Sequence, residues 1–361
     1  MSKQSFKLPT KILAIIVVVA VIAVAIALIV VITASLSDEQ RFSYELKADG
    51  TYEIVDVKNA YRGGWFAKES IVVPATHKGA NVTSIKTMNL QRTKYVEISE
   101  GIKTIGVSAF YGSAIEKIKL PSTLKSIGNN AFNGCHNLTE INLPEGMTAL
   151  ANGTFKDCQS LASLTIPSTV KSIGNEVFNG CVSLTTLTIP DGITTIGNSA
   201  FINCSELKTL TLPTSLESIG STPFAGCAKL VYNEYGDGLY LGSTANQHLV
   251  LVGAKDSVTS LEVNSNTIAI IDSALSNKES LTSVTIPQSV VSIGANAFLN
   301  CKNLTSATFA VTTGWVVASS NLPTATTTAI SASDLADTAI AARLLKTDHV
   351  TDIWRCSISA E

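Results

Sequence analysis

Apolar and polar positions alternate in short segments that return at a fixed distance over most of the chain. In residues 163–167, Leu164 and Ile166 are apolar, while Ser163 and Thr165 are polar. A period of two predicts a short β-strand with one buried face. The proline that follows ends the strand, because proline has no N–H for a sheet. The pattern recurs at 23-residue intervals before Pro121, Pro144, Pro167, Pro190 and Pro213.

A second set of apolar positions keeps the same phase. After Pro167, residues 170–173 alternate again and predict a second strand that ends at Ile173. Gly174 is expected to let the backbone turn there. We expect one helical turn over 175–181, which is too short for a stable free helix, with its phenylalanine and cysteine in the core. This pair recurs as Phe132 and Cys135, Phe155 and Cys158, Phe178 and Cys181, Phe201 and Cys204, and Phe224 and Cys227.

A fixed period in the low twenties predicts a solenoid, in which each coil buries its apolar face against its neighbours. Coils stacked about 4.8 Å apart would give a rod roughly 40 Å long. A step of 51 residues between Pro213 and Asn264 is the one interruption. Counted from the proline position, nine units begin at Pro74, Ser99, Pro121, Pro144, Pro167, Pro190, Pro213, Asn264 and Pro287.

The segments around the repeat suggest a division of the chain. Residues 42–70 predict a β-hairpin that caps the first coil, since an uncovered end would expose strand edge and core. The solenoid then covers 71–230 and 259–310, and the insert at 231–258 predicts a β-meander that projects from one coil or widens it. Residues 311–361 predict a C-terminal cap, with a last strand at 315–318 and a helix over 334–346 capped by Ser333.

The N-terminal segment 12–34 is apolar apart from Thr33 and is long enough to span a bilayer as a helix. Lysines at positions 3, 7 and 11 place residues 1–11 in the cytoplasm by the positive-inside tendency. We therefore expect a transmembrane helix at 12–34, which contacts the lipid bilayer, a spacer at 35–41 and an extracellular repeat region. Cleavage near Ala34, giving a secreted protein, is the alternative.

Composition and motifs narrow the function. The formal net charge of −2 argues against nucleic acid as an electrostatic partner. Nucleophile-elbow, zinc-protease and nucleotide-binding motifs do not occur in the sequence, and four scattered histidines give no metal signature. We therefore expect no enzyme activity, no catalytic residue, no bound metal and no cofactor.

The repeat of residues 166–184, Ile-Pro-x-x-Val-x-x-Ile-Gly-x-x-x-Phe-x-x-Cys-x-x-Leu, resembles the BspA-like leucine-rich repeat family over about residues 70–310. The resemblance implies a β-rich leucine-rich-repeat solenoid of short parallel strands and single turns. It also implies a cell-surface protein that binds or adheres to proteins of a host or neighbouring cell. A structural spacer or scaffold with no ligand of its own is the alternative.

Three groups of residues are candidates for chemistry or binding. The cysteine row could form disulfides outside the cell, but in-register side chains stand about 4.8 Å apart, which favours buried free thiols. Outward threonines could bind a protein or a surface polysaccharide, although strand propensity alone also explains them. The tyrosines of the insert could anchor a partner or pack the meander onto the rod. The candidate binding residues are Thr165, Thr186, Thr188, Thr209, Thr211, Tyr232, Tyr235 and Tyr240.

Overall fold

The computed structural model describes residues 18–25, 38–58, 68–320 and 325–357. Of the expected membrane segment 12–34, only residues 18–25 are described, and they are helical with exposed side chains. The remainder of that segment and residues 1–11 lie outside the described part of the chain. None of the described helices has both the length and the apolar character needed to cross a bilayer.

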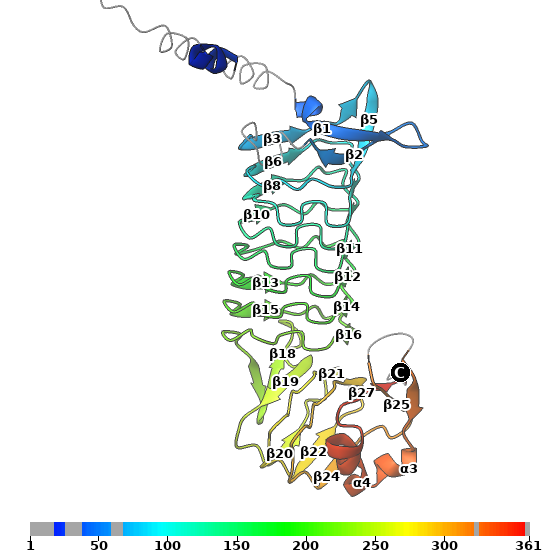
Figure 1. Ribbon diagram of the computed structural model, residues 1–361. Coiled ribbons are helices and arrows are strands. Elements are labelled where there is room, and N and C mark those ends of the chain that lie inside the picture. The colour runs from blue at the N-terminus through cyan, green and yellow to red at the C-terminus, as the bar shows by residue number, and fades with distance from the viewer. Residues whose placement is uncertain (1–17, 26–37, 59–67, 321–324, 358–361) are drawn as a thin grey trace, which may run out of the picture.

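Strands that precede the proline position form the first side of a solenoid of about 10 coils (Figure 1). Residues 163–167, where the sequence predicts a strand, form none, so that prediction is wrong for this coil. In β13 (Thr186–Thr188), Leu187 is buried and both threonines are exposed, which is the alternation expected from the sequence. Equivalent residues pair in parallel register, as Leu187 does with Leu210 of β15 (Thr209–Thr211). The other strands of this side are β3 (Ser70–Val73), β6 (Tyr95–Ile98), β8 (Lys117–Lys119), β10 (Glu140–Ile141), β20 (Ser260–Glu262), β22 (Ser283–Ile286) and β24 (Ser306–Phe309).

Shorter strands, each ending at the isoleucine position, form the second side. β12 (Ser172–Ile173) pairs in parallel with β14 (Thr195–Ile196), so that Ile173 lies beside Ile196. These isoleucines are buried, while the residues before them face outward. The other strands of this side include β5 (Ala80–Ile85), β7 (Thr104–Ile105), β9 (Ser126–Ile127), β11 (Ala149–Leu150), β16 (Ser218–Ile219), β21 (Ala269–Ile270) and β23 (Ser292–Ile293).

The third side contains turns, so the expected helical turn over 175–181 is wrong. Its two consecutive turns are closed by Asn179 N donating to Glu176 O and Cys181 N donating to Phe178 O. Between these bonds, N–H groups donate to the next coil, as Phe178 N does to Ala200 O at 2.8 Å. Bonding between coils thus replaces the i to i−4 bonds that a helix would need.

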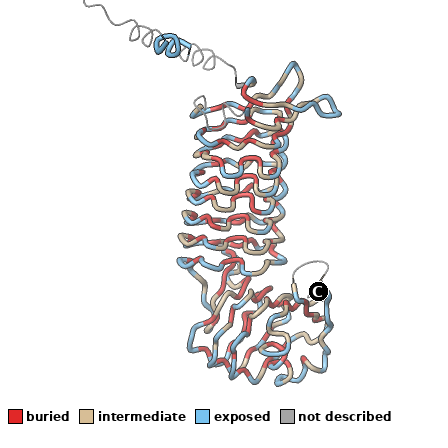
Figure 2. Tube along the Cα trace, viewed as in Figure 1, coloured by how far each residue is buried: buried red, intermediate tan, exposed pale blue. Residues whose placement is uncertain are grey.

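The interior is a column of like side chains, as the sequence predicts. Phe178 is fully buried and stacks on Phe155 and Phe201, with ring centroids 5.9 and 5.4 Å apart. Buried positions follow the inside of every coil in Figure 2. Close packing of this kind gives each coil the core that it lacks alone. The stacked rings belong to Phe110, Phe132, Phe155, Phe178, Phe201 and Phe224.

An asparagine row runs along the second side, and the sequence analysis did not identify it. Asn198 N donates to Asn175 Oδ1 at 2.8 Å, and Asn175 N donates to Asn152 Oδ1 at 2.8 Å. Gly174 is needed for this close approach, because a Cβ there would lie 2.6 Å from Asn152 Oδ1. Its φ is not in the left-handed region, so the prediction that Gly174 permits a turn is wrong.

An antiparallel hairpin covers the first coil. β1 (Phe42–Leu46) pairs with β2 (Tyr52–Val57), and β2 continues in parallel into β5. The preceding 3₁₀ turn η1 (Asp38–Arg41) is linked to β4 (Thr76–His77) through His77 Nδ1, which lies 2.8 Å from Glu39 Oε1. The outer edge of β5, the second-side strand of the first coil, is therefore covered by β2.

The insert widens one coil and supplies its second-side strand. β17 (Asn233–Tyr235) and β18 (Gly238–Leu241) form a hairpin, and β18 pairs antiparallel with β19 (Val250–Ala254). β19 then runs parallel to β21, with Leu251 beside Ile270. The buried side chains form two hydrophobic clusters, and the boundary between them lies in β19. Val250 belongs to the first cluster and Leu251 to the second.

The insert thus separates a first block (residues 42–230) from a second block (residues 259–357), and we call the contact between them the junction. Within the described residues, β16 pairs only with β14, so the second-side sheet breaks at the junction. Asp272 takes the asparagine position there. It accepts from Ala295 N at 3.0 Å in its own block and from Ser221 and the Thr222 backbone in the first block. A carboxylate suits this position because both of its oxygens can accept.

The C-terminal cap covers the end of the second block. β27 (Ile353–Cys356) pairs antiparallel with β23 and with β25 (Trp315–Ala318), which also pairs with β26 (Thr327–Ala329). The single helix expected over 334–346 is wrong: the segment forms α3 (Ala332–Ala336), α4 (Thr338–Arg343) and the π-helical turn η2 (Leu344–Asp348). Asp337 interrupts the helix and caps α4 by accepting from Ala339 N and Ile340 N, so Ser333 is not the cap.

The junction should respond to pH through Asp272. Burial raises the pKa of this carboxyl above its ordinary value, although hydrogen bonds from Ser221, Ala295 and Thr222 oppose the shift. A raised folded-state pKa gives stability that is present below the ordinary pKa and is lost as the pH rises through the raised value. The free energy of unfolding of the wild type, relative to Asp272→Asn, should therefore fall as the pH rises above the ordinary aspartate pKa of about 3.9.

Urea denaturation at several pH values measures this difference. Asp256→Asn is a control for which the stability difference should change with pH in the opposite direction, because the hydrogen bond from Lys278 lowers the pKa of Asp256. The advantage of the wild type over that variant should grow as the pH rises. A wild-type advantage over Asp272→Asn that also grows with pH would contradict the assignment.

Candidate functional site

The predicted threonine positions lie together on the outer surface of the first side, and we call them the threonine face: Thr165, Thr186, Thr188, Thr209 and Thr211. Thr186 lies beside Thr209 and Thr188 beside Thr211 on neighbouring parallel strands. The intervening Leu187 and Leu210 point inward and are 3% and 5% exposed. Because the strand period is two, the buried leucines fix both threonines of each strand on the outer surface.

The hydroxyls of the threonine face differ from those of the neighbouring column. Thr282 Oγ1 donates to Thr259 O at 2.7 Å, and Thr185 Oγ1 donates to Ala162 O at 3.4 Å, so these hydroxyls are bonded to the preceding coil. The five hydroxyls of the threonine face make no side-chain hydrogen bond to any described residue. Four of these threonines are exposed and Thr211 is half-buried. Their hydroxyls can therefore donate to and accept from a partner.

Ion pairs occupy the same side in earlier coils. Lys119 Nζ lies 2.7 Å from Glu97 Oε1, and Lys117 Nζ lies 2.7 Å from Glu140 Oε2. These hydrogen bonds raise the pKa of both lysines. Lysines and glutamates alternate and pair on β6, β8 and β10, so their charges cancel on this part of the first side. The residues of the threonine face are uncharged.

The three candidate tyrosines have different surroundings. Tyr240 is fully buried and its hydroxyl accepts a hydrogen bond from Asn264 N at 3.2 Å, so it offers no surface to a partner. Tyr232 is half-buried and packs against the first hydrophobic cluster. Tyr235 is 41% exposed, with its ring centroid 5.5 Å from that of His248. Of the three, Tyr235 has the ring that is most open to contact.

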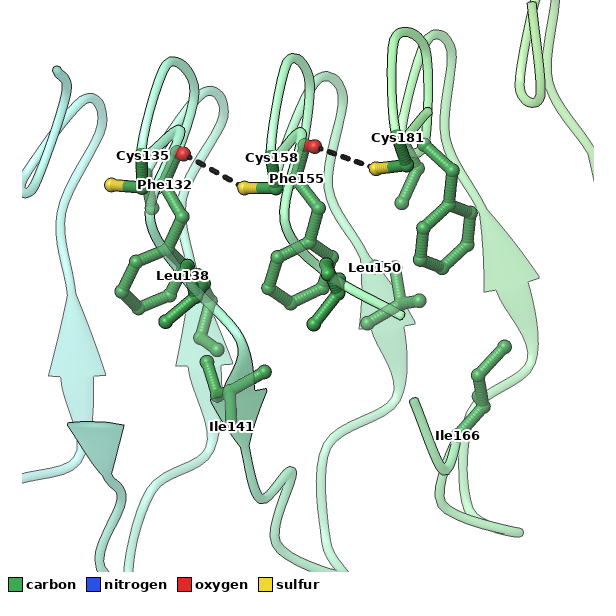
Figure 3. Close-up of a cluster of buried hydrophobic side chains, with 14 of the residues drawn as sticks. Phe132, Cys135, Leu138, Ile141, Leu150, Phe155, Cys158, Ile166 and Cys181 are labelled. Atoms are coloured by element: carbon green, nitrogen blue, oxygen red, sulfur yellow. Dashed lines mark hydrogen bonds between the residues drawn. The ribbon is translucent and has the colours of Figure 1, made fainter. Parts of the chain in front are cut away.

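The cysteine row is buried and unbridged, which confirms the prediction of free thiols. Figure 3 shows the arrangement: Cys158 Sγ donates to Phe132 O at 3.2 Å, and Cys181 Sγ donates to Phe155 O at 3.1 Å. Each thiol thus bonds to the carbonyl of the preceding coil. Burial raises the pKa of Cys135 to about 12 and that of Cys301 to about 11. Thiols of this kind are poor nucleophiles and poor metal ligands.

A cleft of about 900 Å³, which the sequence analysis did not find, lies between the second side of the first block and the C-terminal cap. Its floor includes Thr195 and Ser218, and its opposite wall includes Ser292 and Arg355. Thr195, Ser218 and Ser292 hold the same position of the repeat in different coils, and Arg355 comes from the C-terminal cap, so no local motif reveals the cleft. Across the described part of the chain, no three His, Cys, Asp or Glu side chains gather closely enough to hold a metal ion.

Comparisons with known proteins agree with this architecture. A family model described as BspA type Leucine rich repeat region matches in 6 copies over residues 69–185, 125–245 and 254–321. No curated protein matches the chain.

Similar solved structures are leucine-rich repeat proteins. TpLRR of T. pallidum is 23% identical, covers 73% of this chain and 88% of its own, and gives a TM-score of 0.43. A leucine rich cell surface protein from Faecalibacterium prausnitzii is 26% identical, with 74% of each chain covered and a TM-score of 0.42. The pneumococcal vaccine antigen PcpA is 19% identical, covers 74% of this chain and 68% of its own, and gives a TM-score of 0.44.

Thiol reactivity tests the state of the cysteine row. The seven free cysteines comprise six buried residues and the half-exposed Cys356. In the native protein we expect one thiol to react promptly with Ellman's reagent, because thiolate formation and access are both suppressed in the core. All seven should react in guanidinium chloride, and Cys356→Ser should remove the prompt reaction. Prompt reaction of several thiols in the native protein would contradict the buried row.

Proposed function

Because the chain belongs to the BspA-type leucine-rich repeat family, we propose that it is a membrane-anchored extracellular protein whose threonine face binds a partner protein in adhesion. The family and the solenoid together suggest a protein-binding or surface role. A solenoid presents an extended surface rather than an enclosed active site, so the proposal includes no catalytic step.

The observation that carries this proposal is the uncharged, in-register array of open hydroxyls on β13 and β15. Thr186 and Thr209, like Thr188 and Thr211, repeat at the coil spacing of about 4.8 Å. Each threonine presents both a methyl group and a hydroxyl, so a flat partner can make apolar contacts and hydrogen bonds together. The exposed ring of Tyr235 in the adjoining insert adds an aromatic group of the kind enriched at binding interfaces.

Binding through this face should depend little on salt. Lys117 and Lys119 in the earlier coils are paired with carboxylates, and the threonine positions carry no charge. Long-range electrostatic attraction would therefore contribute little, and screening would remove little. A neutral surface polysaccharide is the second candidate for the same face, on the same observation.

Four substitutions on the threonine face test the adhesion proposal: Thr186→Lys, Thr188→Lys, Thr209→Lys and Thr211→Lys in one variant. A partner that covers this face would remove the four introduced lysine side chains from water while they lie close together. We therefore expect adhesion to extracellular matrix protein to fall at least about 10-fold. Adhesion of cells that display the full chain is the measurement.

The matched control carries four lysines on the second side, at Thr104, Ser126, Ala149 and Ser172. These positions also precede buried residues on stacked parallel strands. The control should adhere like the wild type, and both variants should keep the wild-type unfolding midpoint. Equal adhesion of both variants would favour the spacer alternative, in which deleting one whole coil matters and surface substitutions do not.

The proposed localisation places residues 1–11 in the cytoplasm, residues 12–34 in the bilayer and the solenoid outside. It rests on the length of the apolar segment and the lysines before it. Protease added to intact cells should remove an epitope tag placed after Glu361 and spare a tag placed before residue 12. Lysed cells should lose both tags. A protected C-terminal tag would contradict the orientation, and release of the solenoid into the medium would instead indicate cleavage near Ala34.

A further inference from the structure

The cleft beside the junction is formed by two surfaces that are far apart along the chain. Its floor is the outer surface of β12, β14 and β16 in the first block, and its opposite wall comes from β23 and β27 in the second block. The volume of about 900 Å³ falls within the range of ligand sites, which often lie between structural units. The threonine face lies on the first side, so the cleft is a separate surface.

Short hydroxyl and carboxamide groups occur on both walls of the described lining, together with apolar groups. Examples are Asn175, Thr195 and Ser218 on the floor, with Ser292 and Ser319 on the opposite wall. Of the isoleucines at the floor, Ile219 is half-buried, whereas Ile173 and Ile196 turn their side chains into the core and are only 1% and 2% exposed. Around Ile173 and Ile196 the floor of the cleft therefore presents backbone atoms and the polar side chains of the neighbouring residues.

The charged groups of the described lining are one carboxylate and one guanidinium. Glu217 directly precedes β16 on the floor, and Arg355 lies in β27 on the wall. The two charges balance, so the cleft has no cationic row for a polyanion. The described lining also contains no aromatic side chain of the kind that anchors a protein partner, and its apolar groups, such as the half-buried Ile219 and Val291, are interspersed with polar ones.

We infer that the cleft binds a neutral oligosaccharide. Each sugar hydroxyl both donates and accepts, and the serine, threonine and asparagine groups of the lining can reciprocate from both walls. Thr195 and Ser218 occupy paired positions on neighbouring strands, about 4.8 Å apart, so that hydroxyl groups on the floor repeat at a regular interval. An extended sugar chain can thus meet equivalent hydroxyls at successive coils.

Such a ligand would link the two blocks. It would contact the floor through β14 and β16 and the wall through β23 and β27, across the break in the second-side sheet. A ligand that binds only the assembled junction stabilises it by mass action. Binding should therefore raise the unfolding midpoint in proportion to the logarithm of the free oligosaccharide concentration, well above its dissociation constant.

Isothermal titration of the full chain with neutral pentasaccharides tests the inference. The panel contains linear pentamers of glucose, N-acetylglucosamine, mannose and galactose, with pentagalacturonate as the acidic comparison. We expect at least one neutral pentamer to bind, with little change at about 0.5 M NaCl, and pentagalacturonate to bind at least about 10-fold more weakly.

Ser218→Trp on the floor and Ser292→Trp on the wall should each weaken that binding at least 10-fold, because the indole fills the cleft. Thr104→Trp is the matched control, on the second side but outside the cleft, and should bind like the wild type. Circular dichroism identifies a variant that fails to fold, and the other cleft variant then decides the test.

Failure of every neutral pentamer to bind the wild type would overturn the inference. So would tighter binding of pentagalacturonate, or full binding by the folded cleft variants. None of these results bears on adhesion through the threonine face, which other residues carry.

Discussion

Register between successive coils is the constraint on which the whole structure depends. A single coil has two very short strands and two turns, and it cannot bury its apolar side chains by itself. The next coil supplies the missing partners on every side: strand pairing on the first and second sides, and N–H to carbonyl bonds across the turns. Stacked rings such as Phe155 and Phe178 and thiols such as Cys158 then repeat at the same spacing.

Because one register serves all three sides, outward positions repeat as regularly as inward ones. The row of Thr186 and Thr209 is a consequence of the row of Leu187 and Leu210 beneath it. Evolution can vary the outward residues of each coil without disturbing the packing, which is how ion pairs in early coils give way to hydroxyls further along. The residues of the outer surface are therefore separable from those that maintain the fold.

The register also shows where the molecule departs from a uniform rod. At the junction both stacked sheets and the hydrophobic interior are interrupted together. Asp272 replaces asparagine there because it must accept from both blocks. The same break brings the C-terminal cap opposite the second side and forms the cleft.

Much of this architecture was readable from the sequence, because residues such as Phe178, Cys181 and Ile166 keep one phase over several coils. The row of open threonines was readable too, since a strand period of two assigns Thr186 and Thr188 to the outer surface. The asparagine row also had a signal, in the Asn that follows Gly128, Gly174 and Gly197.

Other features depend on contacts that no local pattern encodes. Turns replace the expected helix because their N–H groups bond to the next coil, which is a tertiary effect. In β19, Leu251 lies 19 residues before its partner Ile270 in β21, so the 23-residue spacing of the repeat does not predict this strand. Tyr240 is buried because the insert folds back on the rod, and the cleft exists only once distant segments meet.

Distances between spin labels on the second side test the central claim of in-register stacking most directly. Labels would be placed at Thr104 and, in turn, at Ser172, Thr195 and Ser218, with Cys356 replaced by serine. These positions lie on β7, β12, β14 and β16. We expect backbone separations near 14, 19 and 24 Å, which is an increase of about 4.8 Å for each added coil. Broad distributions, or separations that do not increase coil by coil, would contradict it.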